Sequence, residues 1–307
     1  MVKGTDLVRY QHLFRLEYNR ALGEIDATNA WNPLGELGTE IPSDGAEEDY
    51  RWLQENPEFQ EWIGDRDLAD LKDYKYTLRN KDFSASVKIF ENELADDKMG
   101  VVLPRVRGMA GGEMRKWGKL IDDLIRNGTS NLAYDGIAFF SDVSGDRNND
   151  NLLASVISLG TPTVAQIATA LRDTRVAGLG FKNSRGEIVG IVFDTFVVPP
   201  NLEMGFLQLV MSSSDPLLTN AGTSNPYRTW VKRIIVDPGL TDGNDFYALS
   251  TGYSIGPFVR QKRQGIELVL DDTFVNVNKT LFFGADFRGN AGYGLPILAA
   301  KVVSGTA

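Results

Sequence analysis

The chain of 307 residues is 42% hydrophobic, which is ample for a buried core, and its length fits one large domain or two ordinary ones. Its formal net charge of −9 argues against tight nucleic-acid binding, which requires a basic face. The absence of cysteine excludes disulfides, thiolate metal sites and cysteine nucleophiles. The single histidine, His12, excludes sites with two or three imidazoles. No signal-peptide core and no long apolar run is present, so we expect a soluble protein made in the cytoplasm.

The first 46 residues predict an N-terminal arm. An amphipathic stretch containing Tyr10, Phe14 and Tyr18 is followed by a segment rich in proline and glycine. This pattern predicts a short helix and then an extended chain. Because the apolar residues have no partner inside the segment, the arm must dock on its own domain or on a neighbouring subunit.

A β-hairpin is predicted next. Two runs of alternating apolar and polar residues, 74–78 and 83–89, flank a polar link of four residues, 79–82. A hairpin with one apolar face and no third strand is marginal alone, so we expect it to lie on another surface. The aromatic residues that precede it, Trp52, Phe59 and Trp62, are better suited to core packing or subunit contact than to a ligand pocket.

A long helix is predicted from about Asp96 to Asn127, because apolar residues recur there at intervals of three or four. It would be on the order of 40 Å long. Pro104 and the pair Gly111-Gly112 weaken the pattern, and we expect a kink or break near one of them.

The second half of the chain alternates short helices and strands. After a polar loop at 141–151, Thr161-Pro162-Thr163 starts a helix with a hydroxyl cap and a proline near its first turn, and a strand is predicted at 188–192. A buried strand then ends at Pro199-Pro200, and either Asn201 or the prolines open another helix. The remainder is rich in β-strand patterns, and its last strands are expected to return to the sheet that packs on the long helix.

No catalytic, cofactor or metal site is predicted. Three adjacent acid pairs, Asp96-Asp97, Asp122-Asp123 and Asp271-Asp272, could be interpreted as the two carboxylates of a glycosidase. Because the side chains of neighbouring residues on a helix point in different directions, Asp122 and Asp123 do not face one another. Solvated surface acids are the better interpretation. The loop 142–151 offers oxygen ligands without the spacing of an EF-hand. No phosphate-binding glycine loop is present.

The one basic cluster comprises Arg260, Lys262 and Arg263. Contact with phosphate is the functional reading. Because the chain is acidic and no aromatic stacking partners lie within the cluster, an ion-paired interface or an exposed strand end fits better.

Several segments resemble a known family. Glu61-Trp62-Ile63-Gly64-Asp65-Arg66, the stretch Tyr76 to Phe83, Leu132 to Gly136, Val197 to Glu203 and Pro257 to Arg263 are similar to segments of the Mu-like phage major head subunit family. The resemblance covers roughly residues 40–305, and Tyr76 to Phe83 is its most specific part.

This resemblance implies an α+β protein with the Hong Kong 97 capsid fold. The implied parts are an N-terminal arm at 1–46, an extended β-hairpin loop at 47–92, a peripheral domain with a long spine helix and a β-sheet at 93–151 and 273–307, and an α/β axial domain at 152–272. Expected contacts between subunits involve residues of the loop, the hairpin and the basic cluster. They are Trp52, Phe59, Trp62, Arg66, Tyr76, Arg79, Lys81, Phe83, Arg260, Lys262 and Arg263.

The resemblance further implies a non-enzymatic virion protein whose copies form hexamers and pentamers of an icosahedral shell. The arm and the hairpin, for which the sequence shows no partner in their own domain, are therefore expected to lap onto neighbouring subunits. Expected partners are a separately encoded scaffold, a portal, possible decoration proteins and double-stranded DNA held without sequence-specific contacts, with no membrane. An acidic wall suits this role, because many phosphate contacts would hinder packing and release of DNA. Two alternatives remain open: a nanocompartment shell of the same fold, and a carboxylate-dependent cell-wall hydrolase.

Overall fold

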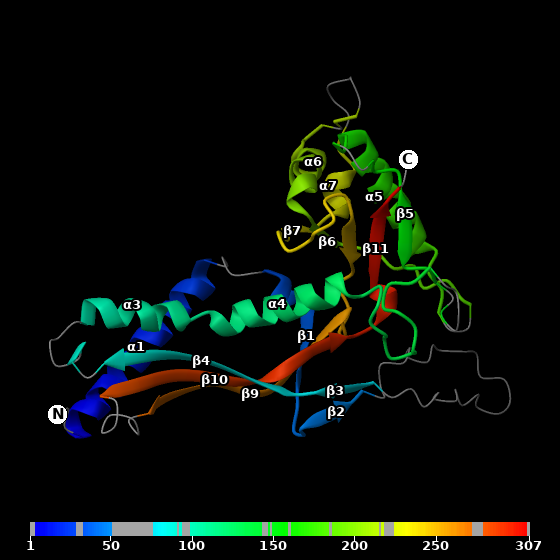
Figure 1. Cartoon of the computed structure of the whole chain (residues 1–307). Coiled ribbons are helices and arrows are strands. Elements are labelled where there is room, and N and C mark those ends of the chain that lie inside the picture. Colours follow the sequence, from blue (N-terminus) through cyan, green and yellow to red (C-terminus); the bar gives the residue numbers. More distant parts are fainter. Residues whose placement is uncertain are drawn as a thin grey trace, which may run out of the picture.

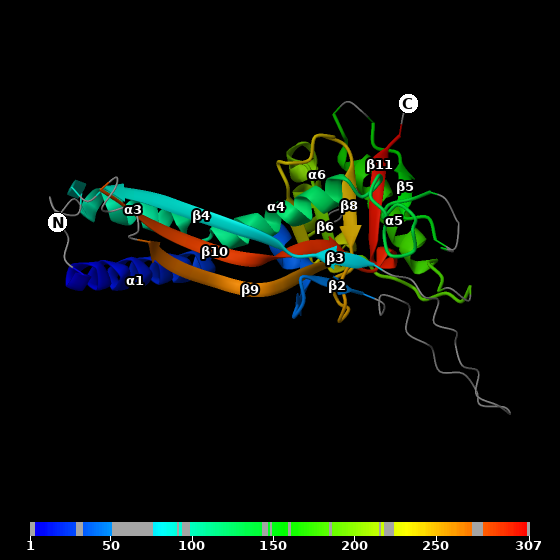
Figure 2. The same cartoon turned by 60° about the horizontal axis from the view of Figure 1, so that its bottom comes forward.

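The computed structural model describes residues 4–28, 33–50, 76–90, 92–93, 99–142, 147, 149–158, 161–183, 186–214, 216–217, 224–271 and 279–305. Figures 1 and 2 show two parts. A long unit is built on an extended, curved sheet, and a compact unit stands at one end of it. The N-terminus lies at the far end of the long unit, and the C-terminus lies in the compact unit. The mixture of helix and sheet confirms the predicted α+β class.

The sheet of the long unit has four strands in the order β1-β9-β10-β4. Its centre is the antiparallel pair of β9 (Phe258–Asp271) and β10 (Thr280–Tyr293). On one side β1 (Gly38–Pro42) runs parallel to β9, and on the other β4 (Lys81–Phe90) runs antiparallel to β10. The prediction that the last strands return to the sheet that packs on the long helix is confirmed for β9 and β10 and wrong for the C-terminal strand, β11 (Ala299–Ser304), which belongs to the other large sheet.

The predicted hairpin is wrong in its pairing. The run that forms β4 pairs with β10 over ten residues, whereas β3 (Thr77–Arg79) pairs with β2 (Glu47–Asp49). Only Asn80 separates β3 from β4. The alternation was interpreted correctly as strand, but a polar link of four residues does not by itself make a turn. The apolar face of β4 has a better partner in β10, far away in sequence.

The long helix is divided in two. Helix α3 (Met99–Met109) contains Pro104, and α4 (Gly112–Arg126) follows after Gly111, whose φ of 72° is left-handed. The break predicted near one of these residues is therefore confirmed at the glycine pair. The buried side chains of α4 include Trp117, Ile121 and Ile125, four residues apart, so one face of the helix packs on the sheet and on the segment before β1.

The N-terminal helix, α1 (Gly4–Thr28), is longer than the short helix predicted. Its fully buried Phe14 packs edge-on against Phe283 of β10 at 5.4 Å, in one cluster with Val102 and Val106 of α3. The sequence left open whether the arm docks on its own domain or on a neighbour, and the expectation of lapping onto neighbours is wrong for this helix. Its apolar stripe is matched by α3 and the sheet of its own chain (Figure 2).

The compact unit contains a five-stranded sheet in the order β5-β11-β8-β6-β7. Its strands are β5 (Leu152–Ser155), β6 (Thr195–Val198), β7 (Arg233–Val236), β8 (Phe246–Leu249) and β11 (Ala299–Ser304). The sheets therefore divide the chain differently from the ranges predicted for the domains. Strand β9 belongs to the long unit, and the C-terminal strand β11 belongs to the compact one.

Helices cover the sheet of the compact unit. They are α5 (Val164–Leu179), α6 (Pro200–Met211) and the single turn α7 (Tyr227–Trp230). Two 3₁₀ turns, η1 (Pro33–Leu37) and η2 (Pro296–Leu298), precede β1 and β11. The predicted hydroxyl cap of α5 is confirmed, and the capping residue is Thr163, which forms a capping box with Gln166. Of the two predicted starts of α6, the prolines and Asn201, the prolines are the observed one.

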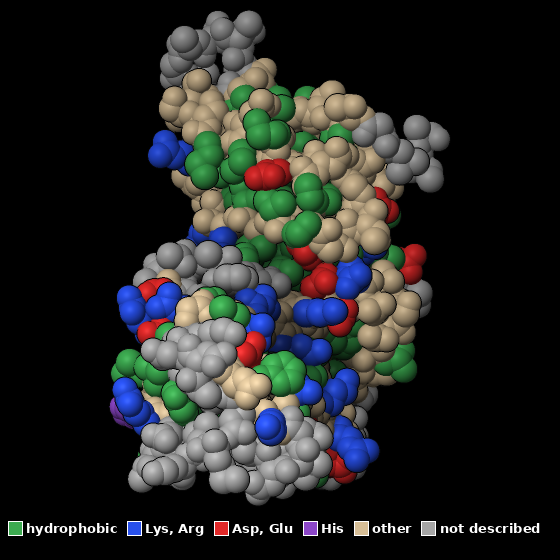
Figure 3. Space-filling model, turned by 60° about the vertical axis from the view of Figure 1, so that its left-hand side comes forward, with side chains coloured by type: hydrophobic (Ala, Val, Ile, Leu, Met, Phe, Trp, Pro, Cys, Tyr) green, Lys and Arg blue, Asp and Glu red, His purple; other side chains and the backbone are tan. Residues whose placement is uncertain are grey.

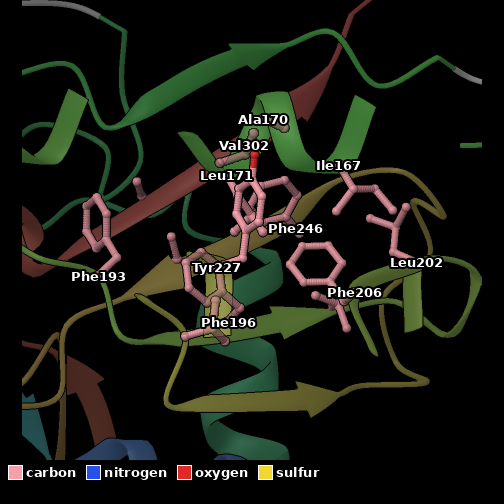
Figure 4. Close-up of a cluster of buried hydrophobic side chains, with 14 of the residues drawn as sticks. Ile167, Ala170, Leu171, Phe193, Phe196, Leu202, Phe206, Tyr227, Phe246 and Val302 are labelled. Atoms are coloured by element: carbon pink, nitrogen blue, oxygen red, sulfur yellow. The ribbon is translucent and has the colours of Figure 1, made fainter. Parts of the chain in front are cut away.

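The core of the compact unit is dense in aromatic rings. Figure 4 shows Phe196, Phe206 and Phe246 meeting between the sheet and α6, with Leu171 of α5 nearby. Residues 188–192, predicted as a strand, form no named strand, and Ile188 is 69% exposed. Among the described helices, none combines the length and the apolar content that crossing a membrane requires.

Candidate assembly surface

The base of the extended loop is fastened to the long sheet by one buried side chain, Gln261 of β9. Its amide donates to the carbonyl of Leu78 at 3.1 Å and to Oδ1 of Asn80 at 2.8 Å. Its own oxygen accepts from the hydroxyl of Tyr50 at 2.6 Å. Gln261 is fully buried, and burial raises the pKa of Tyr50. Both arms of the loop base, at Tyr50 and at Leu78, are therefore held in fixed register.

The sequence carried a signal for Gln261 that the prediction missed. In a strand, alternate residues point to opposite faces, so Gln261 must point away from the face that Arg260 and Lys262 share. Gln261 thus lies on the face of β9 that the loop base covers, opposite the face where Lys262 meets Glu113 of α4. The charges of Arg260 and Lys262 are the visible feature of this segment, and only the alternation of the strand indicates the buried position between them.

Four of the expected contact residues lie outside the described residues: Trp52, Phe59, Trp62 and Arg66. Tyr76 is described and is half-buried. Its hydroxyl accepts a hydrogen bond from the backbone N–H of Tyr293 at 3.0 Å, and burial raises its pKa. In this chain Tyr76 thus helps to seat the loop base on β10.

The next three expected residues surround the start of β4. Arg79 and Lys81 are exposed, with side chains that point away from the core. Phe83 instead packs on Phe287 of β10 at a ring separation of 5.0 Å, and Lys116 of α4 lies 4.5 Å above its ring. Phe83 therefore has partners within its own chain.

Each residue of the basic cluster is ion-paired within the chain. Arg260 lies 3.5 Å from Glu40 and donates to the carbonyl of Gly38 at 3.0 Å. Lys262 pairs with Glu113 of α4 at 3.4 Å. Arg263 lies 3.7 Å from Asp44. The cluster thus joins β1 and α4 to β9. These pairings favour the interpretation as an ion-paired interface rather than as a phosphate-binding site.

The acid pair on α4 was predicted to be solvated, and for one member this is wrong. Asp122 is buried, with 9% of its surface exposed, whereas the side chain of Asp123 is 48% exposed. The cause is tertiary: the turn after β7 covers this face of α4 and brings Asp237 against Asp122. The side chain of Asp271 and both residues of the pair at 96–97 lie outside the described residues.

The polar loop at 141–151 is anchored by its own side chains. Arg147 pairs with Asp135 and donates to the carbonyl of Ala138 at 2.9 Å, while Asn149 exchanges two hydrogen bonds with the backbone of Lys182. In the part of the chain that the structure describes, no three histidine, aspartate or glutamate side chains are grouped to hold a metal ion.

An apolar face on the compact unit was not predicted. Figure 3 shows hydrophobic side chains gathered on the upper part of the molecule. Met204 and Met211 lie on the outer side of α6, 64% and 70% exposed. Beside them a groove of about 240 Å³ is lined by Leu207, Val210, Met211, Val231 and Ile234 and bordered by Arg228, Lys232 and Arg233. Exposed apolar surface of this kind is a candidate for protein contact. We call these side chains the α6 face.

Solved shell proteins share the architecture. The procapsid subunit of bacteriophage JBD30 aligns over 100% of this chain and 77% of its own, with a TM-score of 0.57 at 22% identity. A virus-like particle from Pyrococcus furiosus aligns over 92% of this chain and 96% of its own, with a TM-score of 0.53 at 10% identity. The SrpI encapsulin of Synechococcus elongatus covers 91% and 92%, with a TM-score of 0.52 at 12% identity. The chain has the Hong Kong 97 fold of viral capsid and related shell proteins.

Sequence comparison then narrows the class. Residues 7–158 match the family model described as Mu-like prophage major head subunit gpT. The major capsid protein of Escherichia phage Mu is 23% identical over 284 residues, 91% of this chain and 68% of that protein. The Mu-like prophage FluMu major head subunit of Haemophilus influenzae is 35% identical over 107 residues, a match that spans only 34% of either protein. The chain belongs to the Mu-like major head subunit family.

Proposed function

We propose that this chain is the major capsid protein of a Mu-like tailed bacteriophage. Its copies form hexamers and pentamers that close into an icosahedral shell around double-stranded DNA. The observation that carries the proposal is the family match over residues 7–158. The fold, which extends over the whole chain, is consistent with it.

Two features of the molecule support this role. The α6 face exposes apolar surface on the compact unit, where a second copy can bury it. The net charge of −9 disfavours tight binding of the enclosed DNA. The further partners in this proposal are a scaffold, a portal and possible decoration proteins. The shell would assemble in the host cytoplasm and end in the virion.

The expected contact residues acquire more specific roles. Arg79 and Lys81 are exposed and free to meet a neighbouring subunit, and Trp52, Phe59, Trp62 and Arg66 remain candidates for the same role. Tyr76, Phe83, Arg260, Lys262 and Arg263 have partners in their own chain. In this proposal these five shape the surface that the others present.

The test is to express the full chain alone and together with a candidate scaffold protein from the same source, and to examine the purified material by electron microscopy and light scattering. We expect capsomers or closed particles. A chain that remains monomeric at high concentration with the scaffold present would contradict the proposal.

A second candidate is a nanocompartment shell, which the likeness to the SrpI encapsulin favours. That likeness concerns the fold alone, at 12% identity, so we rank it below the phage capsid. The contents of particles isolated from the native source separate the two: genomic DNA identifies a phage head, and a single cargo protein identifies a compartment.

A further inference from the structure

Two buried carboxyl groups, those of Asp122 and Asp237, meet where the compact unit packs against α4. Asp122 lies in the middle of α4, and Asp237 directly follows β7. Only 9% and 5% of their surfaces are exposed. Arg126 donates to Oδ2 of Asp122 at 2.9 Å, and the backbone N–H of Gly239 donates to Oδ1 of Asp237 at 2.9 Å. The second oxygen of each, Oδ1 of Asp122 and Oδ2 of Asp237, is buried with no hydrogen-bond partner among the described residues.

The turn after β7 brings the two groups into one small space. A Cβ atom added to Gly239 would lie 3.0 and 3.1 Å from the two oxygens of Asp122 and 3.1 Å from Oδ1 of Asp237. The backbone of the turn therefore closes directly over both carboxyl groups. A hydrated divalent cation, which needs six or more oxygen ligands and has only two carboxylates here, would have to push this turn away.

Two ionised carboxylates cannot both be stable in such a place. Burial disfavours each charge, the two charges repel, and Arg126 is shared with the exposed Asp123, which it contacts at 2.9 Å. One proton resolves the conflict. A protonated carboxyl supplies an O–H donor to the other, removes one charge and gives the unpartnered oxygens their hydrogen bond.

The surrounding charges reinforce this conclusion. On the turn, Asp242 accepts from the N–H of Asn244, and Asp245 is paired with Lys301 of β11 at 3.1 Å. Tyr247 of β8 lies close enough for the charges of Asp122 and Asp237 to contribute to the rise of its pKa, which burial chiefly causes. Beside α4, Glu36 of η1 forms an ion pair with Arg233 of β7 at 2.7 Å. Lys301 and Arg233 are thus ion-paired with other acids, and the cation that contacts Asp122 is Arg126.

We propose that Asp122 and Asp237 share one proton, and that this proton fastens the compact unit to α4, so that the junction loosens when the proton leaves. The site is a proton-binding site between two parts of the molecule. It is independent of the proposed function and would operate in an unassembled chain as well as in a shell.

The direction of the pH effect follows from the folded and unfolded states. Burial, repulsion by Asp237 and the hydrogen bond with it raise the pKa of Asp122 from 3.8 to about 6, against the opposing effect of Arg126. The folded state therefore binds the proton more tightly than the unfolded state does. The stabilisation is complete below the ordinary pKa and is lost as the pH rises through about 6.

The experiment compares thermal unfolding of the full chain, unassembled, between pH 4 and pH 8 for the wild type, Asp237→Asn and Asp122→Asn. An asparagine is permanently neutral and keeps an N–H donor for its partner. We expect the melting temperature of the wild type to fall relative to Asp237→Asn by several degrees as the pH rises from 5 to 7.5. Asp123→Asn is the matched control, because it removes a contact to the same arginine from an exposed carboxylate but keeps both buried acids. Its melting temperature should therefore still fall relative to Asp237→Asn over the same pH range.

Infrared spectroscopy gives a second, direct readout. At pH 5 the carbonyl stretch of protonated carboxyls should be stronger in the wild type and in Asp123→Asn than in both pair variants, by the contribution of one buried carboxyl above the background of the exposed acids. Parallel melting profiles for the wild type and Asp237→Asn, or a carboxyl band of equal strength in the wild type and both pair variants, would overturn the proposal. So would a calcium-dependent rise of the melting temperature at pH 7.5 that Asp237→Asn abolishes, since the pair would then hold a cation.

Discussion

Gly289 of β10 lies where the long sheet packs closely against α4. A Cβ atom at this position would be 2.7 Å from Cη2 of Trp117 on α4 and in still closer conflict with the carbonyl oxygen of Gln261. Neither neighbour can yield, because Trp117 is buried and Gln261 is held on three sides by hydrogen bonds. The glycine thus serves the close approach of β9, β10 and α4.

Gly289→Ala should therefore lower the free energy of unfolding by about 1–3 kcal/mol, the usual cost of forcing extra volume into a packed core. Gly284→Ala, in the same strand, is the matched control, because its Cβ would meet only carbonyl oxygens at 3.8 and 3.9 Å. Urea unfolding of the unassembled chain measures both. Equal stability of the two variants would show that the close approach at Gly289 is not a constraint.

At the scale of the element, the break between α3 and α4 is made by one of two adjacent glycines. Gly111 has the left-handed φ of 72°. Gly112 is the first residue of α4, and a Cβ atom added there would meet only the guanidinium of Arg115, at 3.9 Å. The two positions therefore differ in what they demand of a side chain, although the sequence alone makes them look equivalent.

Substitution by alanine should have opposite effects at the two sites. Gly111→Ala should destabilise the chain by about 1 kcal/mol or more, because a left-handed backbone is unfavourable for an L-residue. Gly112→Ala should be neutral or stabilise by up to about 1 kcal/mol through helix propensity. Thermal unfolding of both variants measures the sign of each stability change. A Gly111→Ala protein as stable as the wild type would show that the break between α3 and α4 does not depend on a left-handed residue at position 111.

The docking of α1 on its own sheet makes a second prediction for an element. Phe14 is fully buried against Phe283, whereas Val8 on the same helix is 66% exposed. Phe14→Ala should cost about 3–5 kcal/mol in an unassembled chain. Val8→Ala should change the stability by less than about 0.5 kcal/mol. If Phe14→Ala unfolds like the wild type in dilute solution but weakens assembled particles, the helix docks on a neighbour and not on its own chain.

At the scale of the whole molecule, the α6 face is a candidate surface for binding another copy. Met211→Lys places a charge in the middle of its apolar area, so a shell interface there would have to bury an unpaired ammonium. We expect particle yield by electron microscopy to fall at least tenfold while the monomer melts as the wild type does. Met211→Leu keeps the apolar surface and should assemble normally. Normal assembly of Met211→Lys would remove this face from the shell contacts.

Much of the local structure could be predicted from the sequence. The hydroxyl cap of α5, a helix that begins beside Pro199-Pro200, the break near the glycine pair and the amphipathic stripe of α1 are confirmed. Each depends on residues within a few positions of one another, whose backbone preferences and spacing act wherever the chain folds. The resemblance to the Mu-like head subunits was likewise present in short segments of sequence, and the fold is the one it implied.

Only the tertiary structure decided which apolar surfaces meet. Strand β4 finds β10 across about two hundred residues instead of pairing with β3, α1 covers its own sheet, and the turn after β7 buries Asp122 beside Asp237. A periodic pattern states which face of an element must be covered, and many partners satisfy it equally well in isolation. The choice among them depends on the joint packing of distant segments, which no local window of the chain contains.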